Sequence, residues 1–287
     1  MALDTKQLQQ WVGKTQEQVD IITSAPIEAL SATLNKTNME ISNGALLPPL
    51  WHWLYFLAPA RHDQLAEDGH LEKGDFLPPV PLPQRMWAGS SFKFHNLLTV
   101  GERVLRQSII KSIEVKQGRS GELAFICINH QISHSAGLAI TEEHNIVYRG
   151  KLPHQAEINS RPEGKLPAHK AQFSKTITPD PVLLFRYSAL TFNGHRIHYD
   201  RDYTTRVEGY PGLIVHGPLL ATFLVELLQE RLPAVTMSRF EFKAVRPVFD
   251  TNPFTVCLHQ LDEDKVTLWV QDHEGLLCMQ AAADVTT

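Results

Sequence analysis

One short pattern occurs twice in this chain, and it constrains the fold more than any other feature. Residues 92–102 and residues 240–250 carry similar side chains at the same relative positions, about half the chain apart. The matching positions are Phe92, Phe94, Leu97, Val100 and Glu102 in the first copy and Phe240, Phe242, Val245, Val248 and Asp250 in the second. Self-similarity at half length indicates duplication of one structural unit. The length of 287 residues, against about 150 for a typical domain, agrees with two such units.

Each half contains a helical stretch followed by strands. In the second half a helix is expected with Gly217 as its N-cap and Pro218 as its first residue, because apolar residues then recur at helical spacing. In the first half the apolar stretch at 46–57 suits a buried helix. Strands are expected at 90–94, 104–116, 122–135, 239–248, 254–261, 266–271 and 276–285. We therefore predict an α+β fold in which each unit is a long central helix wrapped by an antiparallel β-sheet.

The domain boundary is expected between the two copies of this unit. Residues 151–181 are polar and contain several prolines, which is typical of a linker. The predicted domains are therefore 1–150 and 182–287, joined by a linker at 151–181.

Composition and charge exclude several classes of function. Lys plus Arg number 27 and Asp plus Glu 31, so the formal net charge is −4 and nucleic-acid binding is not expected. The three cysteines are far apart, which disfavours a disulfide framework or a zinc knuckle. The N-terminus lacks the apolar core of a signal peptide, and the most apolar stretch is too short to span a bilayer. We expect a cytoplasmic protein without a membrane partner.

The densest group of polar candidates lies between residues 187 and 218. Asn193 and His198 are five residues apart; His198 can give or take a proton near neutral pH, and Asn193 can orient a water molecule. The backbone N–H of Gly217 lies at a predicted helix start, where N–H groups are free and no Cβ blocks an approaching oxygen. Together these groups could activate a water and stabilise an oxyanion, although a polar turn and an ordinary helix start would give the same patterns.

The same segments carry a specific resemblance. The run Phe192-Asn193-Gly194-His195-Arg196-Ile197-His198-Tyr199-Asp200, followed by Gly212-Leu213-Ile214-Val215-His216-Gly217-Pro218, resembles the MaoC-type, or R-specific, enoyl-thioester hydratases of the hot-dog fold. Segments at 85–90, 118–121, 141–143 and 240–253 resemble the double hot-dog branch of that family, and with them the resemblance covers most of the chain.

The resemblance implies a hydro-lyase whose active site lies in the second half. His198 matches the family's catalytic histidine, Gly217 its oxyanion donor, and Asn193 stands where most members have Asp, so His198 would be the only titrating group of the pair. The first half has no such motif, since Asn35 is followed at the same spacing by Glu40, and it is expected to be catalytically degenerate.

For the substrate, the resemblance favours a short dicarboxylic acyl-CoA of the mesaconyl or itaconyl kind, with coenzyme A as part of the substrate. Arg246 shares the parity of Phe240 and Phe242 and is a candidate for the distal carboxylate if no bulge intervenes. Arg196 and His216 are further candidates for substrate binding. The alternatives are a (3R)-3-hydroxyacyl-thioester dehydratase acting on fatty acyl groups and a non-catalytic acyl-thioester binding module.

No metal or redox cofactor is expected. Three histidine ligands suffice to bind zinc, and this segment contains His195, His198 and His216. His195 and His198 are, however, an odd number of residues apart and would point oppositely in an extended segment. Apart from the substrate, the sequence leaves a homodimer open.

Overall fold

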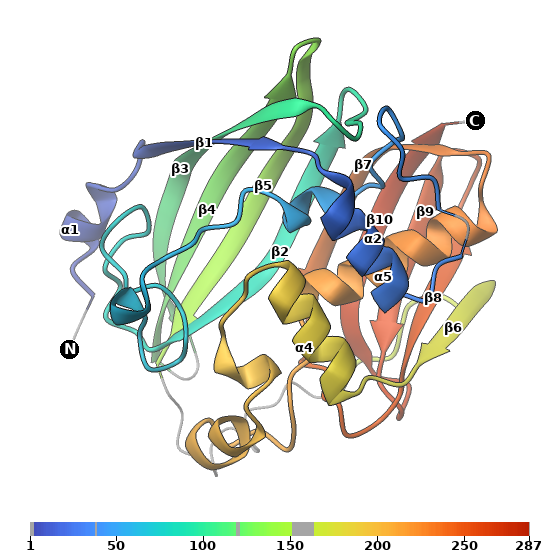
Figure 1. The fold of residues 1–287 in the computed structure, drawn as a ribbon. Coiled ribbons are helices and arrows are strands. Elements are labelled where there is room, and N and C mark those ends of the chain that lie inside the picture. Colours follow the sequence, from blue (N-terminus) through green and yellow to red (C-terminus); the bar gives the residue numbers. More distant parts are fainter. Residues whose placement is uncertain (1–2, 38, 119–120, 151–163, 287) are drawn as a thin grey trace.

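The chain forms a single ten-stranded antiparallel sheet that curves around helices (Figure 1). The computed structural model describes residues 3–37, 39–118, 121–150 and 164–286. The strand order is β1-β3-β4-β5-β2-β7-β10-β9-β8-β6, so the first five positions come from the N-terminal half and the last five from the C-terminal half. Among the described residues, no helix is long and apolar enough to cross a membrane.

The two halves meet at the centre of the sheet, where the repeated pattern pairs with itself. Strand β2 (Gln84–Phe94) runs antiparallel to β7 (Thr236–Ala244), and Phe92 lies directly opposite Phe240. Equivalent strands then follow outward in the same order on either side. The sequence repeat therefore marks two copies of one unit, related by an approximate two-fold axis between these phenylalanines.

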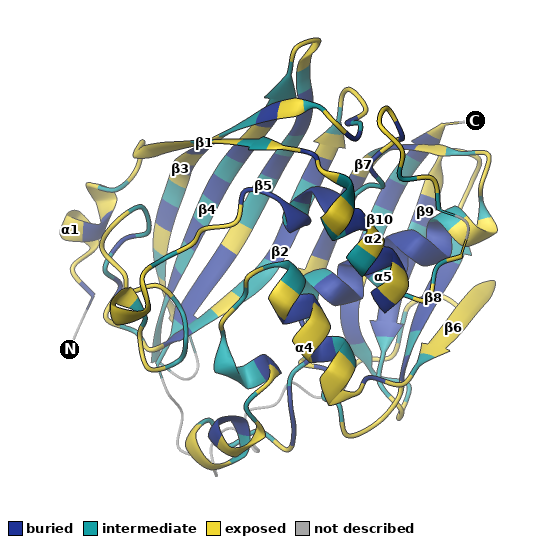
Figure 2. Ribbon diagram, in the orientation of Figure 1, coloured by how far each residue is buried: buried dark blue, intermediate teal, exposed yellow. Residues whose placement is uncertain are grey.

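The C-terminal unit has the predicted architecture. Helix α5 (Gly217–Arg231) lies in the concave face of the sheet and is buried along most of its length (Figure 2). The sheet around it consists of β6 (Phe173–Ile177), β7, β8 (Phe254–Gln260), β9 (Lys265–Gln271) and β10 (Leu277–Thr286). Leu219, Leu224 and Leu227 are fully buried, as their helical spacing predicts.

The N-terminal unit departs from the prediction of a long central helix. Its sheet consists of β1 (Thr15–Ile21), β2, β3 (Arg103–Gly118), β4 (Gly121–His134) and β5 (Gly137–Arg149). The helix expected at 46–57 is only the single turn η1 (Trp51–Leu54). Asp20 Oδ2 accepts a hydrogen bond from the Phe56 N–H at 2.7 Å, and Phe56 takes the left-handed φ of 55°. These tertiary contacts end the helix, and the chain continues as a long loop that includes η2 (His62–Gln64).

Three short α-helices lie outside the sheet in the described part of the chain, and the turns η3 (Arg196–His198) and η4 (Tyr203–Val207) connect α4 to α5. Helix α1 (Thr5–Gln9) precedes β1, and α2 (Ser24–Thr33) packs against α4 (Pro181–Leu190) of the other half. Strand β6 lies within the predicted linker at 151–181 and pairs with β8. Residues 151–163 of that linker lie outside the described residues. The predicted domains stay a prediction, since one sheet runs through both.

Candidate active site

The segment after α4 is folded by its own polar groups. The Asn193 N–H donates to the Ser188 carbonyl at 2.8 Å, and Asn193 Oδ1 accepts from the His195 N–H at 3.0 Å. The second contact is an Asx turn, in which the side chain replaces a backbone acceptor. Asn193 therefore fixes the turn that leads into the short helix η3 (Arg196–His198). Its amide nitrogen remains as a donor.

His198 is held in one orientation and one tautomer. Its Nδ1 lies 2.7 Å from the Ile214 carbonyl oxygen, which can only accept a hydrogen bond, so Nδ1 carries the proton. Its Nε2 is then the basic nitrogen. The side chain is buried, and burial lowers the pKa of His198 to about 4. His198 is therefore a neutral base over the physiological range.

His216 and Gly217 lie beside His198 at the start of α5. The His216 ring stacks on His198 with centroids 3.7 Å apart, and its Nε2 lies 2.8 Å from Ser188 Oγ. Gly217 is the first residue of the helix and His216 its N-cap, one position earlier than predicted. A Cβ at Gly217 would meet no atom within 4 Å. A substrate oxygen therefore has room to approach this helix N-terminus, where N–H groups carry partial positive charge.

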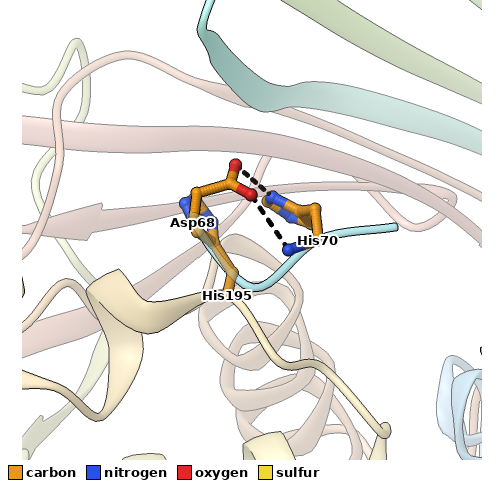
Figure 3. A group of neighbouring side chains, drawn as sticks. All are labelled: Asp68, His70 and His195. Carbon is orange, nitrogen blue, oxygen red and sulfur yellow. Dashed lines mark hydrogen bonds and ion pairs between the residues drawn. The ribbon is translucent and has the colours of Figure 1, made fainter. Parts of the chain in front are cut away.

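A second polar group from the N-terminal half reaches this site. Asp68 accepts hydrogen bonds from the backbone N–H of His70 at 3.0 Å and from His70 Nδ1 at 2.8 Å (Figure 3). The His70 ring lies 4.0 Å from that of His195, and His195 meets His198 edge to face at 5.5 Å. Sequence reasoning missed Asp68 and His70, because they belong to a loop far from the recognised motifs. The Asp-Gly-His triplet in a loop was the available signal.

Burial sets the charge of this group. It lowers the pKa of both His70 and His195, so both rings are neutral at neutral pH. For Asp68, burial acts to raise the pKa, but the hydrogen bonds from His70 outweigh it and keep the pKa below its usual range. The site therefore holds one carboxylate and a row of neutral imidazoles.

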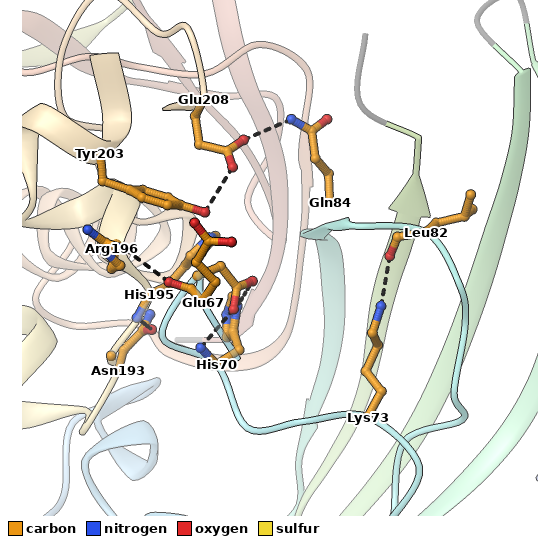
Figure 4. A network of polar contacts seen from close by, with 12 residues as sticks. Glu67, His70, Lys73, Leu82, Gln84, Asn193, His195, Arg196, Tyr203 and Glu208 are labelled. Atoms are coloured by element: carbon orange, nitrogen blue, oxygen red, sulfur yellow. Dashed lines mark hydrogen bonds and ion pairs between the residues drawn. The ribbon is translucent and has the colours of Figure 1, made fainter. Parts of the chain in front are cut away.

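Arg196 fixes the loop of the N-terminal half in place. Its backbone N–H donates to the Asp68 carbonyl at 2.9 Å, and its Nη1 donates to the Glu67 carbonyl at 3.2 Å (Figure 4). The guanidinium also binds Asp200 Oδ2 through Nε at 3.0 Å and Nη2 at 2.8 Å. These contacts engage Arg196 within the protein, so its expected role in substrate binding has little support in the geometry.

Arg246 lies at an irregularity just after β7. The N–H groups of Val245 and Arg246 both donate to the Cys278 carbonyl, which marks an irregularity that breaks the parity on which the expectation depended. The guanidinium lies 3.6 Å from Asp272 in the turn between β9 and β10. The structure therefore pairs Arg246 with a carboxylate of its own unit.

Two sets of side chains can be considered for a metal. His198 and His216 stack face to face, so the trio weighed from the sequence does not converge. Asp68, His70 and His195 have ligand atoms within 4.8 Å of one another. Both oxygens of Asp68, however, accept N–H groups of His70, so binding an ion would cost these hydrogen bonds. The arrangement is better suited to proton transfer.

Solved structures with the same fold place the chain in a structural class. A MaoC-like dehydratase from Phytophthora capsici superimposes with a TM-score of 0.70 at 14% identity, covering 99% of each chain. A Mycobacterium tuberculosis protein with a double hot-dog fold superimposes with a TM-score of 0.59 at 13% identity, covering 96% of each chain. The fold is therefore a double hot dog, with a histidine beside the N-terminus of the C-terminal central helix.

Sequence relatives then identify the family. The model of the family hydroxyacyl-thioester dehydratase type 2 matches residues 50–250. The mesaconyl-C(4)-CoA hydratase of Chloroflexus aurantiacus is 42% identical over 275 residues, which is 96% of each chain. The mitochondrial hydroxyacyl-thioester dehydratase type 2 of Schizosaccharomyces pombe is 29% identical over 284 residues, 88% of this chain and 91% of the relative. The chain belongs to the hydroxyacyl-thioester dehydratase type 2 family and is a hydro-lyase of the MaoC-like kind.

Proposed function

We propose that this protein hydrates the double bond of a short dicarboxylic acyl-CoA, converting mesaconyl-C4-CoA or itaconyl-CoA to citramalyl-CoA. The observation that carries the proposal is the 42% identity to a mesaconyl-C(4)-CoA hydratase along nearly the whole chain. The buried neutral His198 beside the open N-terminus of α5 supplies the groups that hydration needs.

In the proposed reaction, His198 acts as the general base. Its Nε2 takes a proton from water while the water oxygen bonds to Cβ and the π electrons move toward the thioester carbonyl. The Gly217 N–H binds the oxygen on which negative charge develops, a contact typically worth about 3 kcal/mol. His198 then returns the proton to Cα, which restores the neutral base. Proton transfer by a positioned side chain is worth about 10²–10⁴-fold.

Asn193 is proposed to orient the water. Its Oδ1 already accepts from the His195 N–H, so the amide nitrogen is the group left to bind the water. This assignment gives the neutral Asn a use that does not require the carboxylate found in most family members. Itaconyl-CoA has its double bond one position further from the thioester, and it would need a proton shift at Cα by the same base.

Two other functions stay as alternatives for the test. The relatives named hydroxyacyl-thioester dehydratases favour a fatty (3R)-3-hydroxyacyl substrate as the second candidate. A non-catalytic acyl-thioester binding module is the candidate from another class. We also propose a cytoplasmic location, as the composition suggests.

One assay distinguishes these functions. Purified protein is mixed separately with mesaconyl-C4-CoA, crotonyl-CoA and a long-chain trans-2-enoyl-CoA, and loss of the conjugated double bond is followed by absorbance. The proposal expects the highest kcat/KM with mesaconyl-C4-CoA. A preference for the long chain would favour the fatty substrate. Binding of all three without turnover would overturn the enzyme assignment at this site.

A further inference from the structure

Arg85 lies on the inner face of the central strand β2, at the side of the candidate active site. Its Cα partner on the neighbouring strand β5 is Tyr148, so the two side chains emerge on the same face of the sheet. Trp87, two residues further along β2, stacks on His144 of β5 with ring centroids 3.9 Å apart. The inner face of these two strands therefore presents a guanidinium and a phenol next to each other.

The hydroxyl of Tyr148 lacks an acceptor. Tyr148 is fully buried, and the Arg85 guanidinium donates to its hydroxyl oxygen, so that among the described residues only the hydroxyl proton lacks an acceptor. Burial raises the pKa of Tyr148, while the nearby charge of Arg85 acts in the opposite direction. Because a buried polar group without a partner is costly, such a hydroxyl suggests that a partner is supplied by a ligand.

Arg85 brings positive charge that its surroundings do not neutralise. Within the described part of the chain its guanidinium makes no ion pair. Burial and then the charge of Arg85 lower the pKa of His70 and of Lys73. Arg85 also acts to lower the pKa of His144 and His195, after burial and nearer groups. The geometry that links Arg85 to the loop is its pairing with Tyr148, because Lys73 of that loop lies 5.6 Å from the centre of the Tyr148 ring.

The charges around this point favour an anion. Lys73 lies 5.6 Å from the centre of the Tyr148 ring and donates to the carbonyls of Val80 at 2.7 Å and Leu82 at 2.9 Å. The charge of Asp68 acts to raise the pKa of Tyr148 and of Lys73. Both oxygens of Asp68, however, already accept hydrogen bonds from His70. Two cations and a hydroxyl proton without an acceptor therefore lie beside a carboxylate that is already engaged.

We propose that Arg85 and Tyr148 bind the free carboxylate of the acyl group and make the enzyme specific for dicarboxylic thioesters. This inference rests on the proposed function and names the residues for the role that the sequence had suggested for Arg246. A carboxylate offers two oxygens in one plane, which suits a guanidinium fork on one side and a hydroxyl on the other. The contact stabilises the bound acyl group and forms no covalent bond.

The position agrees with the chemistry of mesaconyl-C4-CoA. In this substrate the free carboxylate is attached to Cβ, the carbon that water attacks, so its partner must lie near the base. The loop that carries Lys73 to Tyr148 also carries His70, whose ring lies 4.0 Å from that of His195, and His195 meets His198 at 5.5 Å. An arginine at this place can hold the carboxylate while Cβ faces His198 and the thioester oxygen faces Gly217.

The test compares two unreactive ligands in calorimetric binding assays. Methylsuccinyl-CoA carries the carboxylate, and isovaleryl-CoA has a methyl group in its place. Arg85→Gln should weaken the binding of methylsuccinyl-CoA about 10²-fold, because losing one partner of a buried charge pair is costly. The same substitution should change the affinity for isovaleryl-CoA less than about threefold. Tyr148→Phe should weaken the binding of methylsuccinyl-CoA about tenfold and leave the binding of isovaleryl-CoA unchanged. Arg239→Gln, at an exposed arginine on the neighbouring strand β7, is the matched control and should change neither.

Each outcome decides the proposal. Equal weakening of both ligands, or unchanged affinity in folded Arg85→Gln protein, would overturn it. If Arg85→Gln does not fold, Arg85→Lys and Tyr148→Phe answer the same question, because each keeps one of the two donors. Wild-type protein that hydrates mesaconyl-C4-CoA while the Arg85 variants keep their selectivity would leave the proposed function standing and reject only this subsite.

Discussion

Gly69 and Gly194 pack so closely that a Cβ on Gly69 would lie 1.9 Å from the Gly194 carbonyl oxygen. One glycine belongs to the loop of the N-terminal half and the other to the turn that follows Asn193. Their contact carries Asp68 and His70 to His195. The N-terminal unit, which the sequence suggests to be catalytically degenerate, therefore contributes directly to the candidate site.

Gly69→Ala should displace the loop and reduce activity. The added Cβ cannot be accommodated unless one of the two backbones moves, and φ at Gly69 is +87°. Gly44→Ala is the matched control, because Gly44 has φ of +88° and nothing within 4 Å of a Cβ. Both variants carry the left-handed penalty of about 1–2 kcal/mol. A kcat for Gly69→Ala at least tenfold below that of Gly44→Ala is expected, and equal values would show that the contact is unimportant.

The protein should lose stability as the pH falls from about 6.5 to 4. Burial lowers the pKa of His144 and His198 to about 4 and that of His130 to about 3. Their unfolded pKa is near 6.5, so below that pH the unfolded state binds more protons than the folded state and the free energy of unfolding decreases. Each such histidine costs about 1.4 kcal/mol per pH unit in this window. Urea unfolding at pH 7.5, 6 and 5 measures the trend, and a flat profile would contradict the burial of these rings.

Asn193→Asp should move the acidic limb of kcat/KM to higher pH. The substituted carboxylate can still accept from the His195 N–H, but it adds a negative charge near His198. That charge favours the imidazolium and raises the pKa of the base, so the base is protonated over more of the working range. Asn193→Ala should lower kcat and leave the limb in place. Two pH–rate profiles with one enoyl-CoA make the comparison. An unshifted acidic limb in the folded Asn193→Asp variant would show that Asn193 and His198 do not share a site.

Apolar spacing in the sequence predicted the helices and strands that bury one regular face. Helix α5 and strands such as β8 and β9 lie where apolar spacing placed them, because each buries one regular face. The helix expected at 46–57 ends early through the contact between Asp20 and Phe56, whose two members are far apart in sequence. No periodicity within 46–57 could reveal that contact.

The candidate site was predictable to the extent that it lies within one motif. His198 stacks on His216, and Gly217 follows His216 at the start of α5, since a short segment and a helix start define this part of the site. Asp68 and His70 reach the site through a loop whose course depends on tertiary packing. For Arg246 the sequence could not show the strand irregularity at Cys278 or the pairing with Asp272, and its role in substrate binding stays a prediction.

The most direct test of the central claim is the activity of His198→Ala toward the best enoyl-CoA substrate. We expect a kcat about 10²-fold or more below wild type, because the variant lacks the base that takes the proton from water. His95→Ala, which removes an exposed imidazole bound to Thr141, should keep wild-type activity, and circular dichroism verifies that both variants are folded. Wild-type turnover by folded His198→Ala protein would show that His198 is not the base and would contradict the proposed reaction.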